Sequence, residues 1–313
     1  MLTDVVVTGD NGSIDGQGSV WWDWFESRSL NYSRPHLVEF TSSDHVVVSN
    51  LTFLNAPAYN IHPVYCSYVL VQNISISAPG GSPYTIGIVP DSSNNVCIED
   101  SLIKVGYDAI SLKSGWDEYG IAYDRPTKDV HIRRVYLQST SGSSIAFGSE
   151  MSGGISNVHV EQVRIHNSYS GIEFRTTKGR GGYIKRIIIS NVELKNITMA
   201  FGASGDCGSH PDDNFDPNAI PILDQITLQN VTGSKITVAG NFTGLAESPF
   251  TSLCLFNVAL TIPSTSTSWT CSNVVGYSES VSPEPCPELK SSHSNSSSFC
   301  YSILNSYGKS TDL

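Results

Sequence analysis

Ionisable and hydroxyl side chains in this chain gather in polar turns that border short apolar segments. Carboxylates that share such a surface can act as a general acid and a general base, and cations beside them can bind an anionic ligand. The turns around Ile86, Tyr107, Ser149 and Glu173 are spaced by near-multiples of a coil of roughly 21 residues. If the chain coils with that period, one surface carries the candidate site residues Asp91, Asp108, Lys113, Ser149, Glu150, Glu173 and Arg175, with Asp117 and Glu118 in a loop nearby.

Each candidate also has an ordinary structural role. Asp91 follows a proline and could cap a turn. Glu173 and Arg175 point the same way in an extended segment, so they could form an ion pair on the wall of a groove. For Asp108 the structural and the functional roles are equally supported. Groove-lining or loop-anchoring roles are the simplest for two others, Lys113 and Glu150.

An eight-residue unit recurs along the chain and identifies the elements that position these turns. Each copy holds two short stretches of alternating apolar residues with a polar break between them, which is often Asn. The copies are VVVSNLTF (46–53), VLVQNISI (69–76), VCIEDSLI (96–103), VHIRRVYL (130–137), VHVEQVRI (158–165), IIISNVEL (187–194), ITLQNVTG (226–233) and LCLFNVAL (253–260).

This repeat predicts an all-β fold, a single-stranded right-handed parallel β-helix in which coils stack around one apolar core. The recurring Asn residues are expected at one corner, where their amides can form a ladder. An antiparallel sandwich would also show regular short strands, but it would not need the same unit in register.

The domain organisation follows from where the repeat is interrupted and where it ends. Longer gaps predict projecting loops at 115–127 and 203–221, which in a solenoid usually build the binding face. The only helix expected lies around residues 21–26. The repeat ends after about Pro263, and we predict one β-helix domain over 1–288 followed by a Ser-rich tail over 289–313.

Composition and charge indicate a secreted protein rather than a nucleic-acid-binding one. The formal net charge of the 313 residues is −11, which argues against nucleic acid as a partner. No apolar run has transmembrane length. No signal peptide precedes the first strand-like segment, so we expect the N-terminus to be truncated. Sequons for N-glycosylation predict an extracellular glycoprotein, and they begin at Asn11, Asn31, Asn50, Asn73, Asn196, Asn230, Asn241 and Asn295.

The seven cysteines are compatible with an oxidising compartment. Cys271, Cys286 and Cys300 cluster in a Ser/Pro-rich region, as in disulfide-closed tails. One of the seven has to stay unpaired within the chain. Cys97 and Cys254 lie inside apolar runs and are equally compatible with free thiols and with bridges.

Four segments carry a resemblance to a known family: GDNGSIDGQGSVWWDWF (9–25), LKSGWDEYGIAY (112–123), FGSEMSGGI (147–155) and KGRGGYIK (178–185). Over nearly its whole length the chain resembles the plant polygalacturonases of glycoside hydrolase family 28. The resemblance implies a pectin-lyase-like solenoid, inverting hydrolysis of α-1,4-galacturonan in pectin, and a location in the cell wall. It implies no cofactor and no metal. We expect a monomer whose partner is pectic polysaccharide, either galacturonan or a branched pectin domain.

The family's catalytic motifs are altered at the matching positions of this chain. The family uses three aspartates, one in an N-T-D motif and two in a following G-D-D. N-T-D falls on residues 84–86, so Ile86 stands where the first aspartate would be. G-D-D falls on residues 106–108, so Tyr107 replaces one aspartate and Asp108 retains the other.

These replacements have a chemical cost. Inverting hydrolysis needs a protonated acid and a separate carboxylate that activates water, roughly 6.5–9.5 Å apart. Asp108 alone cannot fill both roles. Tyr107 is a weak acid because an unperturbed phenol has a pKa of about 10, and Ile86 cannot polarise water. A relocated pair, Asp108 with Glu173 or with Asp91, would restore two carboxylates.

The motifs that imply substrate binding differ as well. Ser149 occupies the position of a supporting histidine, and the family's R-I-K motif has become Glu173-Phe174-Arg175. A carboxylate at position 173 would repel a galacturonate carboxylate, so we hypothesise a neutral or differently placed sugar there, as in a rhamnose-containing or branched pectin domain. Neither Tyr183 nor Phe215 matches the family's substrate-contacting tyrosine cleanly.

We therefore predict a polygalacturonase-type glycoside hydrolase that acts on pectin. The alternative is a catalytically impaired β-helix that binds pectic polysaccharide without cleaving it. A calcium-dependent pectate lyase is disfavoured, because the sequence offers no converging set of carboxylates for Ca²⁺ with a basic residue as proton abstractor.

Overall fold

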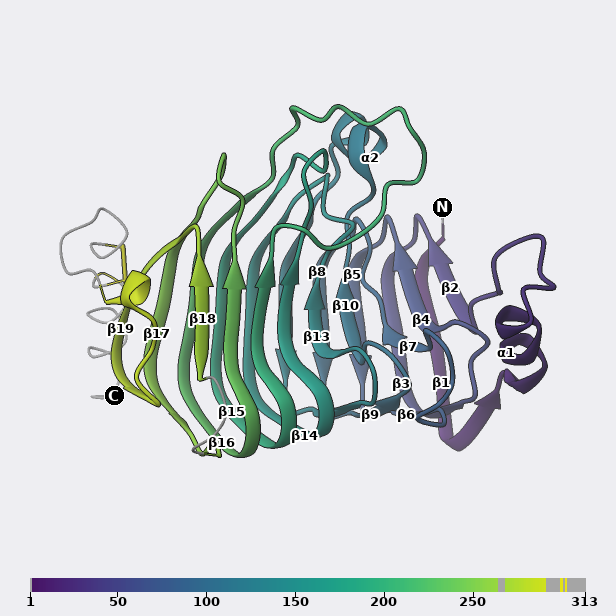
Figure 1. Ribbon diagram of the computed structural model, residues 1–313. Coiled ribbons are helices and arrows are strands. Elements are labelled where there is room, and N and C mark those ends of the chain that lie inside the picture. Colours follow the sequence, from purple (N-terminus) through teal and green to yellow (C-terminus); the bar gives the residue numbers. More distant parts are fainter. Residues whose placement is uncertain (1, 264–267, 291–298, 301, 303–313) are drawn as a thin grey trace.

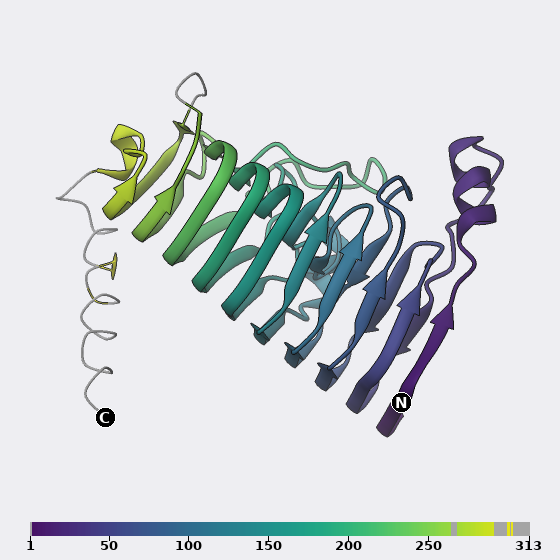
Figure 2. The same ribbon diagram turned by 90° about the horizontal axis from the view of Figure 1, so that it is seen from below.

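Parallel strands dominate the structure, because segments with alternating apolar residues recur one coil apart along the chain. This computed structural model describes residues 2–263, 268–290, 299, 300 and 302. All pairings between the named strands are parallel. The chain is therefore an all-β stack of coils, and Figures 1 and 2 show its strands side by side in sequence order.

The strands fall into three columns, which we define by their pairing. The first column runs through β1 (Thr3–Asp15), β3 (Asp44–Leu54), β5 (Ser67–Gln72), β8 (Asn94–Glu99), β11 (Thr127–Arg133), β14 (Ile155–Arg175), β15 (Tyr183–Ser204), β16 (Ile222–Thr243), β17 (Phe250–Leu260) and β19 (Val274–Ser282).

Two further columns close each coil. The second holds β6 (Ser75–Ser77), β9 (Leu102–Val105) and β12 (Tyr136–Ser139), between β3 and β14. The third holds β2 (Val38–Thr41), β4 (Tyr59–Val64), β7 (Ile86–Ile88), β10 (Ile110–Leu112) and β13 (Ser143–Phe147), continues through the later residues of β14, β15 and β16, and ends at β18 (Trp269–Ser272).

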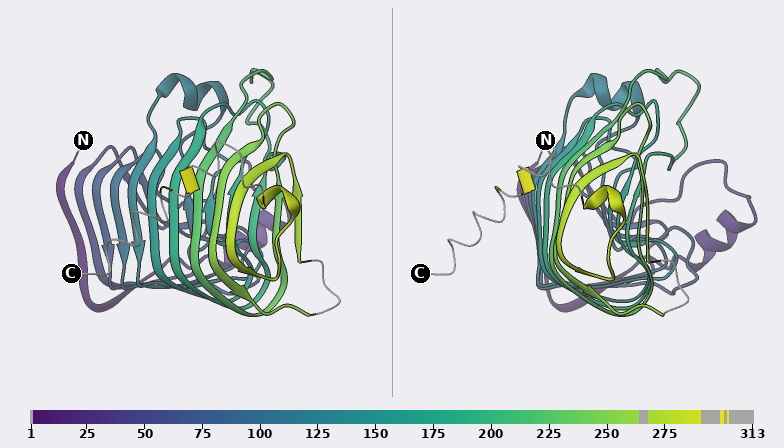
Figure 3. Two further views of the ribbon diagram at one scale, coloured as in Figure 1. Left: turned by 90° about the vertical axis from the view of Figure 1, so that its left-hand side faces the viewer. Right: turned by 60° about the vertical axis from the view of Figure 1, so that its left-hand side comes forward.

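The eight copies of the sequence repeat lie in register with one another. Their first residues are successive register partners in the first column, and each exposes 4% or less of its surface: Val46, Val69, Val96, Val130, Val158, Ile187, Ile226 and Leu253. Each such buried aliphatic side chain contributes about 1.5–3 kcal/mol. Figure 3 shows the coils closing around the interior in which this hydrophobic core lies.

The recurring Asn residues form the predicted ladder at a corner of the coils. The Asn73 side-chain amide donates to Asn50 at 2.6 Å, Asn230 donates to Asn191 at 3.3 Å, and Asn257 donates to Asn230 at 2.9 Å. All five have a backbone φ between 51° and 56°, in the left-handed region that Asn tolerates better than most residues. Asn therefore suits this corner for two reasons: its side-chain amide forms the ladder, and its backbone tolerates the left-handed conformation.

Helices are few among the described residues, and only the first of them was predicted. α1 (Ser19–Glu26) lies where the sequence indicated a helix. α2 (Asp117–Tyr123) forms inside the predicted loop 115–127, and a single 3₁₀ turn, η1 (Pro287–Leu289), follows the last strand. Figure 1 shows α2 and the long loop between β15 and β16 projecting from the same side of the stack, at the top of the view. Among the described residues, no helix is both long enough and apolar enough to cross a membrane.

The coils also continue past the point where the eight-residue unit ends. β18 pairs with β16 and β19 pairs with β17, so strands continue after the eight-residue unit ends near Pro263, within the range 1–288 predicted for the β-helix domain. The tail predicted over 289–313 lies almost entirely outside the described residues. Leu289, at its start, is fully buried.

Two disulfides join cysteines near the C-terminal end of the described chain. Cys254 pairs with Cys300, and Cys271 pairs with Cys286. Cys254 is therefore bridged, whereas Cys97 is one of three free thiols, with Cys66 and Cys207. Of the two positions that the sequence left open, one is a bridge and the other is a free thiol.

The left-handed corner predicts how substitutions of Asn257 affect stability. Asn257→Ala keeps φ near 51° without the amide, so we expect a loss of about 1–2 kcal/mol in the free energy of unfolding. Asn257→Gly also loses the hydrogen bond to Asn230 but adopts this φ freely, so it should be the more stable of the two. Urea denaturation measures both, and a glycine variant less stable than the alanine variant would contradict the role of the backbone.

Candidate active site

A cleft of about 690 Å³ opens beside the third strand column, between the segment after α1 and the loop that carries α2. Its wall on the α1 side contributes Phe25, Arg28, Leu30, Tyr32, Ser33, Arg34 and His36. The coils and the far loops contribute Ala58, Tyr59, Tyr84, Ile86, Tyr107, Asp108, Ser111, Lys113, Trp116, Gly148, Ser149, Glu150, Arg175, Arg180, Cys207, Gly208 and Ser209.

Most of the residues predicted from the sequence meet in this cleft. Its lining includes seven of them: Ile86, Tyr107, Asp108, Lys113, Ser149, Glu150 and Arg175. Asp91 and Glu173 are not among the lining residues. The strand register explains the convergence, because Gly87 N donates to Asp108 O at 3.0 Å and Ile88 pairs with Ile110. The two polar turns therefore lie one above the other, as predicted.

Asp108 is fixed on the cleft floor by a bidentate ion pair. Arg175 donates from Nη1 to Asp108 Oδ2 at 2.8 Å and from Nη2 to Asp108 Oδ1 at 3.1 Å. The backbone N–H of Ser143 also donates to Oδ1, at 2.8 Å. Asp108 exposes only 2% of its surface. Gly142 permits this packing, because a Cβ there would lie 2.6 Å from Asp108 Oδ1.

Glu173 completes the network behind the floor. Arg175 Nε donates to Glu173 Oε2 at 2.7 Å, and the hydroxyl of Ser143 donates to the same oxygen at 2.8 Å. The two side chains thus form the pair two residues apart that the sequence suggested. Burial opposes the charge of Arg175, but the carboxylates of Asp108 and Glu173 raise its pKa above the ordinary value. Arg175 is therefore shared by two carboxylates, and Glu173 is not among the residues that line the cleft.

Tyr107 is a poor replacement for the missing aspartate. Its ring lies 5.7 Å from the guanidinium carbon of Arg175. Burial, together with the neighbouring Asp108 carboxylate, raises the pKa of Tyr107 above that of a free phenol. Its hydroxyl is therefore an even weaker acid than the sequence comparison implies.

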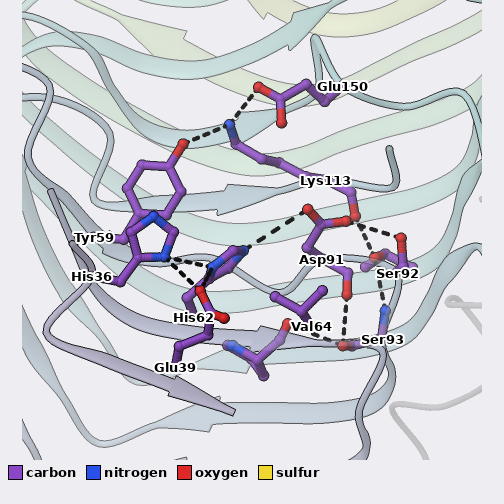
Figure 4. Close-up of polar contacts among 12 residues, drawn as sticks. His36, Glu39, Tyr59, His62, Val64, Asp91, Ser92, Ser93, Lys113 and Glu150 are labelled. Atoms are coloured by element: carbon purple, nitrogen blue, oxygen red, sulfur yellow. Dashed lines mark hydrogen bonds and ion pairs between the residues drawn. The ribbon is translucent and has the colours of Figure 1, made fainter. Parts of the chain in front are cut away.

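A second ion pair crosses the cleft lining. Lys113 Nζ donates to Glu150 Oε1 at 2.7 Å and to the Tyr59 hydroxyl at 3.2 Å (Figure 4). Burial alone would lower the pKa of Lys113, but Glu150 and Tyr59 outweigh it and hold the pKa above its ordinary value. Lys113 therefore stays cationic and orients the carboxylate of Glu150.

Arg180 ties together the loops at the far side of the cleft. It is fully buried and donates to Asp117 Oδ1 at 2.5 Å, to Ser149 O at 2.7 Å and to Ser209 O at 2.7 Å. Asp117, also fully buried, lies 2.9 Å from His210 Nδ1 as well. The prediction placed Asp117 only near the site and missed Arg180. Both lie in the quoted segments LKSGWDEYGIAY and KGRGGYIK, which was the available signal.

Asp91 lies one strand away from the cleft floor. It forms a parallel bridge to Lys113, accepts a hydrogen bond from the Ser92 hydroxyl at 2.9 Å, and faces His62 Nε2 at 3.9 Å (Figure 4). His62 in turn contacts His36, which lines the cleft. Burial and the neighbouring His62 lower the pKa of His36 to about 4.

The cleft is locally cationic although the chain is anionic. Five arginine or lysine side chains line it, namely Arg28, Arg34, Lys113, Arg175 and Arg180, against two carboxylates, Asp108 and Glu150. Within the described part of the chain, Arg28 and Arg34 form no ion pair with a carboxylate. Burial lowers the pKa of Arg34, whose guanidinium lies 4.2 Å above the Phe25 ring. The sequence signalled neither arginine.

Comparison with known proteins identifies related chains. The family model described as "Glycosyl hydrolases family 28" matches residues 1–283. A probable polygalacturonase of Vitis vinifera is 44% identical over 96% of this chain and 61% of its own length. A probable polygalacturonase of Arabidopsis thaliana is 32% identical over 63% of this chain and 40% of its own length. This chain thus spans about three fifths or less of these two relatives.

The fold of this chain also resembles that of solved structures. The exopolygalacturonase of Thermotoga maritima superposes with a TM-score of 0.78 at 22% identity, covering 88% of this chain and 69% of that one. At this identity the likeness concerns the fold alone.

The buried pair of Asp108 and Arg175 predicts a large loss of stability in Arg175→Ala. This variant leaves the buried carboxylate of Asp108 and the partly buried carboxylate of Glu173 without their cation, so we expect the free energy of unfolding to fall by about 3–5 kcal/mol. Arg164→Ala is a matched control, because that side chain is 69% exposed and its pair with Glu193 should contribute less than about 1 kcal/mol. Equal losses in the two variants, measured by urea denaturation, would contradict the structural role of Arg175.

Proposed function

The chain belongs to glycosyl hydrolases family 28, and from this premise we propose that it is a polygalacturonase-type hydrolase that cleaves glycosidic bonds in pectic polysaccharide. The observation that carries the proposal is the cleft, which places an aspartate retained from the family motif, Asp108, on its floor among cationic side chains. Asp108 lies at the matching position of the G-D-D motif.

We infer the finer fold on the same premise. The stacked parallel coils are those of a right-handed parallel β-helix with one strand in each column per coil. Support comes from the continuous register of the first column and from the resemblance to a family with that fold. The domain extends at least over the matched residues 1–283.

The charge distribution favours an acidic polysaccharide as substrate. A protein with a net charge of −11 repels polyanions at long range. In the cleft, however, two arginines without a carboxylate partner, Arg28 and Arg34, create a local attraction. Arginine guanidinium groups bind carboxylates through paired hydrogen bonds. Glu173 lies outside the cleft lining and shares Arg175 with Asp108, and the hypothesis of a neutral or differently placed sugar near position 173 stays a prediction. Galacturonan and a branched pectin domain both stay open as substrates.

Two carboxylates of the described cleft lining are available for inverting hydrolysis, Asp108 and Glu150. The mechanism needs one to activate water and one to protonate the leaving oxygen. Asp108 accepts three hydrogen bonds from Arg175 and Ser143, which orient its carboxylate, and we assign it the water-activating role. Glu150 is the more accessible of the two, with 23% of its side chain exposed, and although it is ion-paired with Lys113 it is the other carboxylate that the described lining offers for the second role. Asp91 and Glu173 lie outside the lining and are not needed.

Secretion into the cell wall follows from the same premise. Two disulfides among the described residues support an oxidising compartment, as do the eight sequons. At Asn73, Asn196 and Asn230 the side-chain amide already donates to a neighbouring Asn. We propose that the protein acts as a monomer, without a cofactor.

Asp108→Asn tests catalysis. Reducing-end release from homogalacturonan, xylogalacturonan and rhamnogalacturonan should occur with the native protein on at least one polymer, and the variant should lose it by at least about a hundredfold. Glu150→Gln should lower the same activity at a more exposed position. Circular dichroism establishes that both variants fold. Binding to a pectin without any release by the native protein would instead identify a non-catalytic pectin-binding β-helix.

Arg28→Ala tests the charge of the cleft. The side chain is exposed and unpaired, so its removal should leave the fold intact and raise KM for polygalacturonate by about tenfold, the value of one charge-assisted hydrogen bond. The increase should shrink at high salt. Arg164→Ala, away from the cleft, serves as control. An unchanged KM in Arg28→Ala would exclude this arginine from substrate binding.

A further inference from the structure

Two imidazoles and a carboxylate converge on the edge of the cleft wall. His36 Nδ1 lies 2.8 Å from His62 Nδ1 and 3.0 Å from Glu39 Oε2, and His62 Nδ1 lies 3.3 Å from the same oxygen. Figure 4 shows the three side chains pointing toward one another from neighbouring segments. The His62 and His36 side chains expose 10% and 22% of their surface.

Hydrogen bonds alone cannot satisfy this triangle. A neutral imidazole carries one N–H and one lone pair. If one ring directs its N–H inward, that proton bridges one edge only, and two lone-pair atoms still face each other. If both rings direct N–H groups inward, the two donors face each other 2.8 Å apart and compete for one oxygen. If neither does, three lone pairs converge. A single cation bound by all three atoms removes every one of these conflicts.

The triangle is close in size to a face of a metal coordination polyhedron, with one edge at the tetrahedral separation and two edges somewhat shorter. Zn²⁺ binds histidine nitrogen at about 2.0–2.1 Å and carboxylate oxygen at about 2.0–2.2 Å in a tetrahedron, which separates neighbouring ligand atoms by roughly 3.3 Å. The three edges measure 2.8, 3.0 and 3.3 Å. Two imidazoles disfavour Mg²⁺ and Ca²⁺, which prefer oxygen ligands. We propose that His36, Glu39 and His62 form a binding site for a divalent transition metal of the zinc type.

The backbone preforms this site. Glu39 on β2 and His62 on β4 are register partners in adjacent parallel strands. His36 is placed by the neighbouring hydrogen bond from Leu37 N to Tyr59 O at 2.8 Å and by stacking on the Tyr59 ring, at 4.3 Å between centroids. His36 and Glu39 also border an open hollow of about 390 Å³, which provides an entry path for an ion.

A supporting carboxylate lies behind His62. His62 Nε2 is buried and has no hydrogen-bond partner among the described residues, yet it faces Asp91 Oδ2 at 3.9 Å. A histidine that binds a metal through one nitrogen commonly donates its other N–H to a carboxylate, which fixes the tautomer and the ring orientation. With Nδ1 on the metal, Nε2 carries the proton, and Asp91 is the carboxylate that it faces, at 3.9 Å. Asp91, predicted from the sequence as a substrate-binding residue, is here a positioning residue for His62.

The site revises the expectation, drawn from the sequence, that the chain binds no metal. The three ligands come from two coils and follow no compact zinc motif, so sequence spacing could not reveal them. The proposal does not rest on the proposed function, because metal binding can be measured without any substrate. Its consequence for the cleft is mechanical: a bound metal would cross-link the segment that carries Arg28 and Arg34 to β4.

Titration of chelator-treated, tag-free protein with Zn²⁺ tests the site by calorimetry. We expect one saturating equivalent, and visible absorption typical of tetrahedral coordination when Co²⁺ replaces zinc. His62→Ala and Glu39→Gln should each weaken binding by at least about tenfold, and Asp91→Asn by about 10–100-fold. Zinc should raise the melting temperature of the native protein but not that of His62→Ala.

A second histidine cluster supplies the matched control. His131, His159 and Glu161 also lie close together, on the first strand column, so His131→Ala removes a comparable cluster elsewhere. Zinc binding should be unchanged in that variant. The proposal is overturned if the native protein shows no saturable binding, if His62→Ala binds as tightly as the native protein, or if His131→Ala abolishes binding. Circular dichroism of each variant separates loss of a ligand from loss of the fold.

Discussion

The parallel register between successive coils is the constraint on which the rest of this structure depends. A residue's neighbours across the sheet lie one coil away in sequence, so side chains from distant segments meet only where the register allows it. Asp108 and Arg175 are 67 residues apart, yet they form a bidentate pair because β10, β13 and β14 hold fixed positions in three successive coils. Glu39 and His62 meet for the same reason on β2 and β4. The polar side chains of the cleft and of the histidine cluster are therefore brought together from different coils.

Much of the fold could be predicted from the sequence because its dominant force is periodic. Alternating apolar residues, such as those beginning at Val46 and Val69, have to face one interior, and the recurrence of Asn50 and Asn73 fixes the corner. What escaped prediction lacks such a period. α2 forms within a loop, where Asp117 is anchored by the distant Arg180 rather than by local pattern. The strands after Pro263 lie within the predicted domain, but the repeat did not give their positions, because they pair through backbone register while their side chains depart from the repeat.

The site residues that lie in a family motif could be predicted from the sequence. Contacts between residues of distant segments could not. The family motifs identified Asp108, Tyr107 and Arg175, which line the cleft. The extended geometry at 173–175 suggested the ion pair between Glu173 and Arg175. Sequence could not show that Asp91 faces His62 instead of the cleft, because that depends on which column each residue occupies. Nor could it show that unpaired arginines give an acidic protein a basic cleft, since net charge does not report where charges gather.

The loops that project from one side of the stack can change in length during evolution, whereas the strand columns cannot. The segment with α2 and the loop between β15 and β16 lengthen their coils without shifting the register of the strands on either side. Insertions at these turns change the rim of the cleft, whereas an insertion within a column would displace every side chain beyond it. Lineages can therefore diversify what the cleft recognises while inheriting the same scaffold.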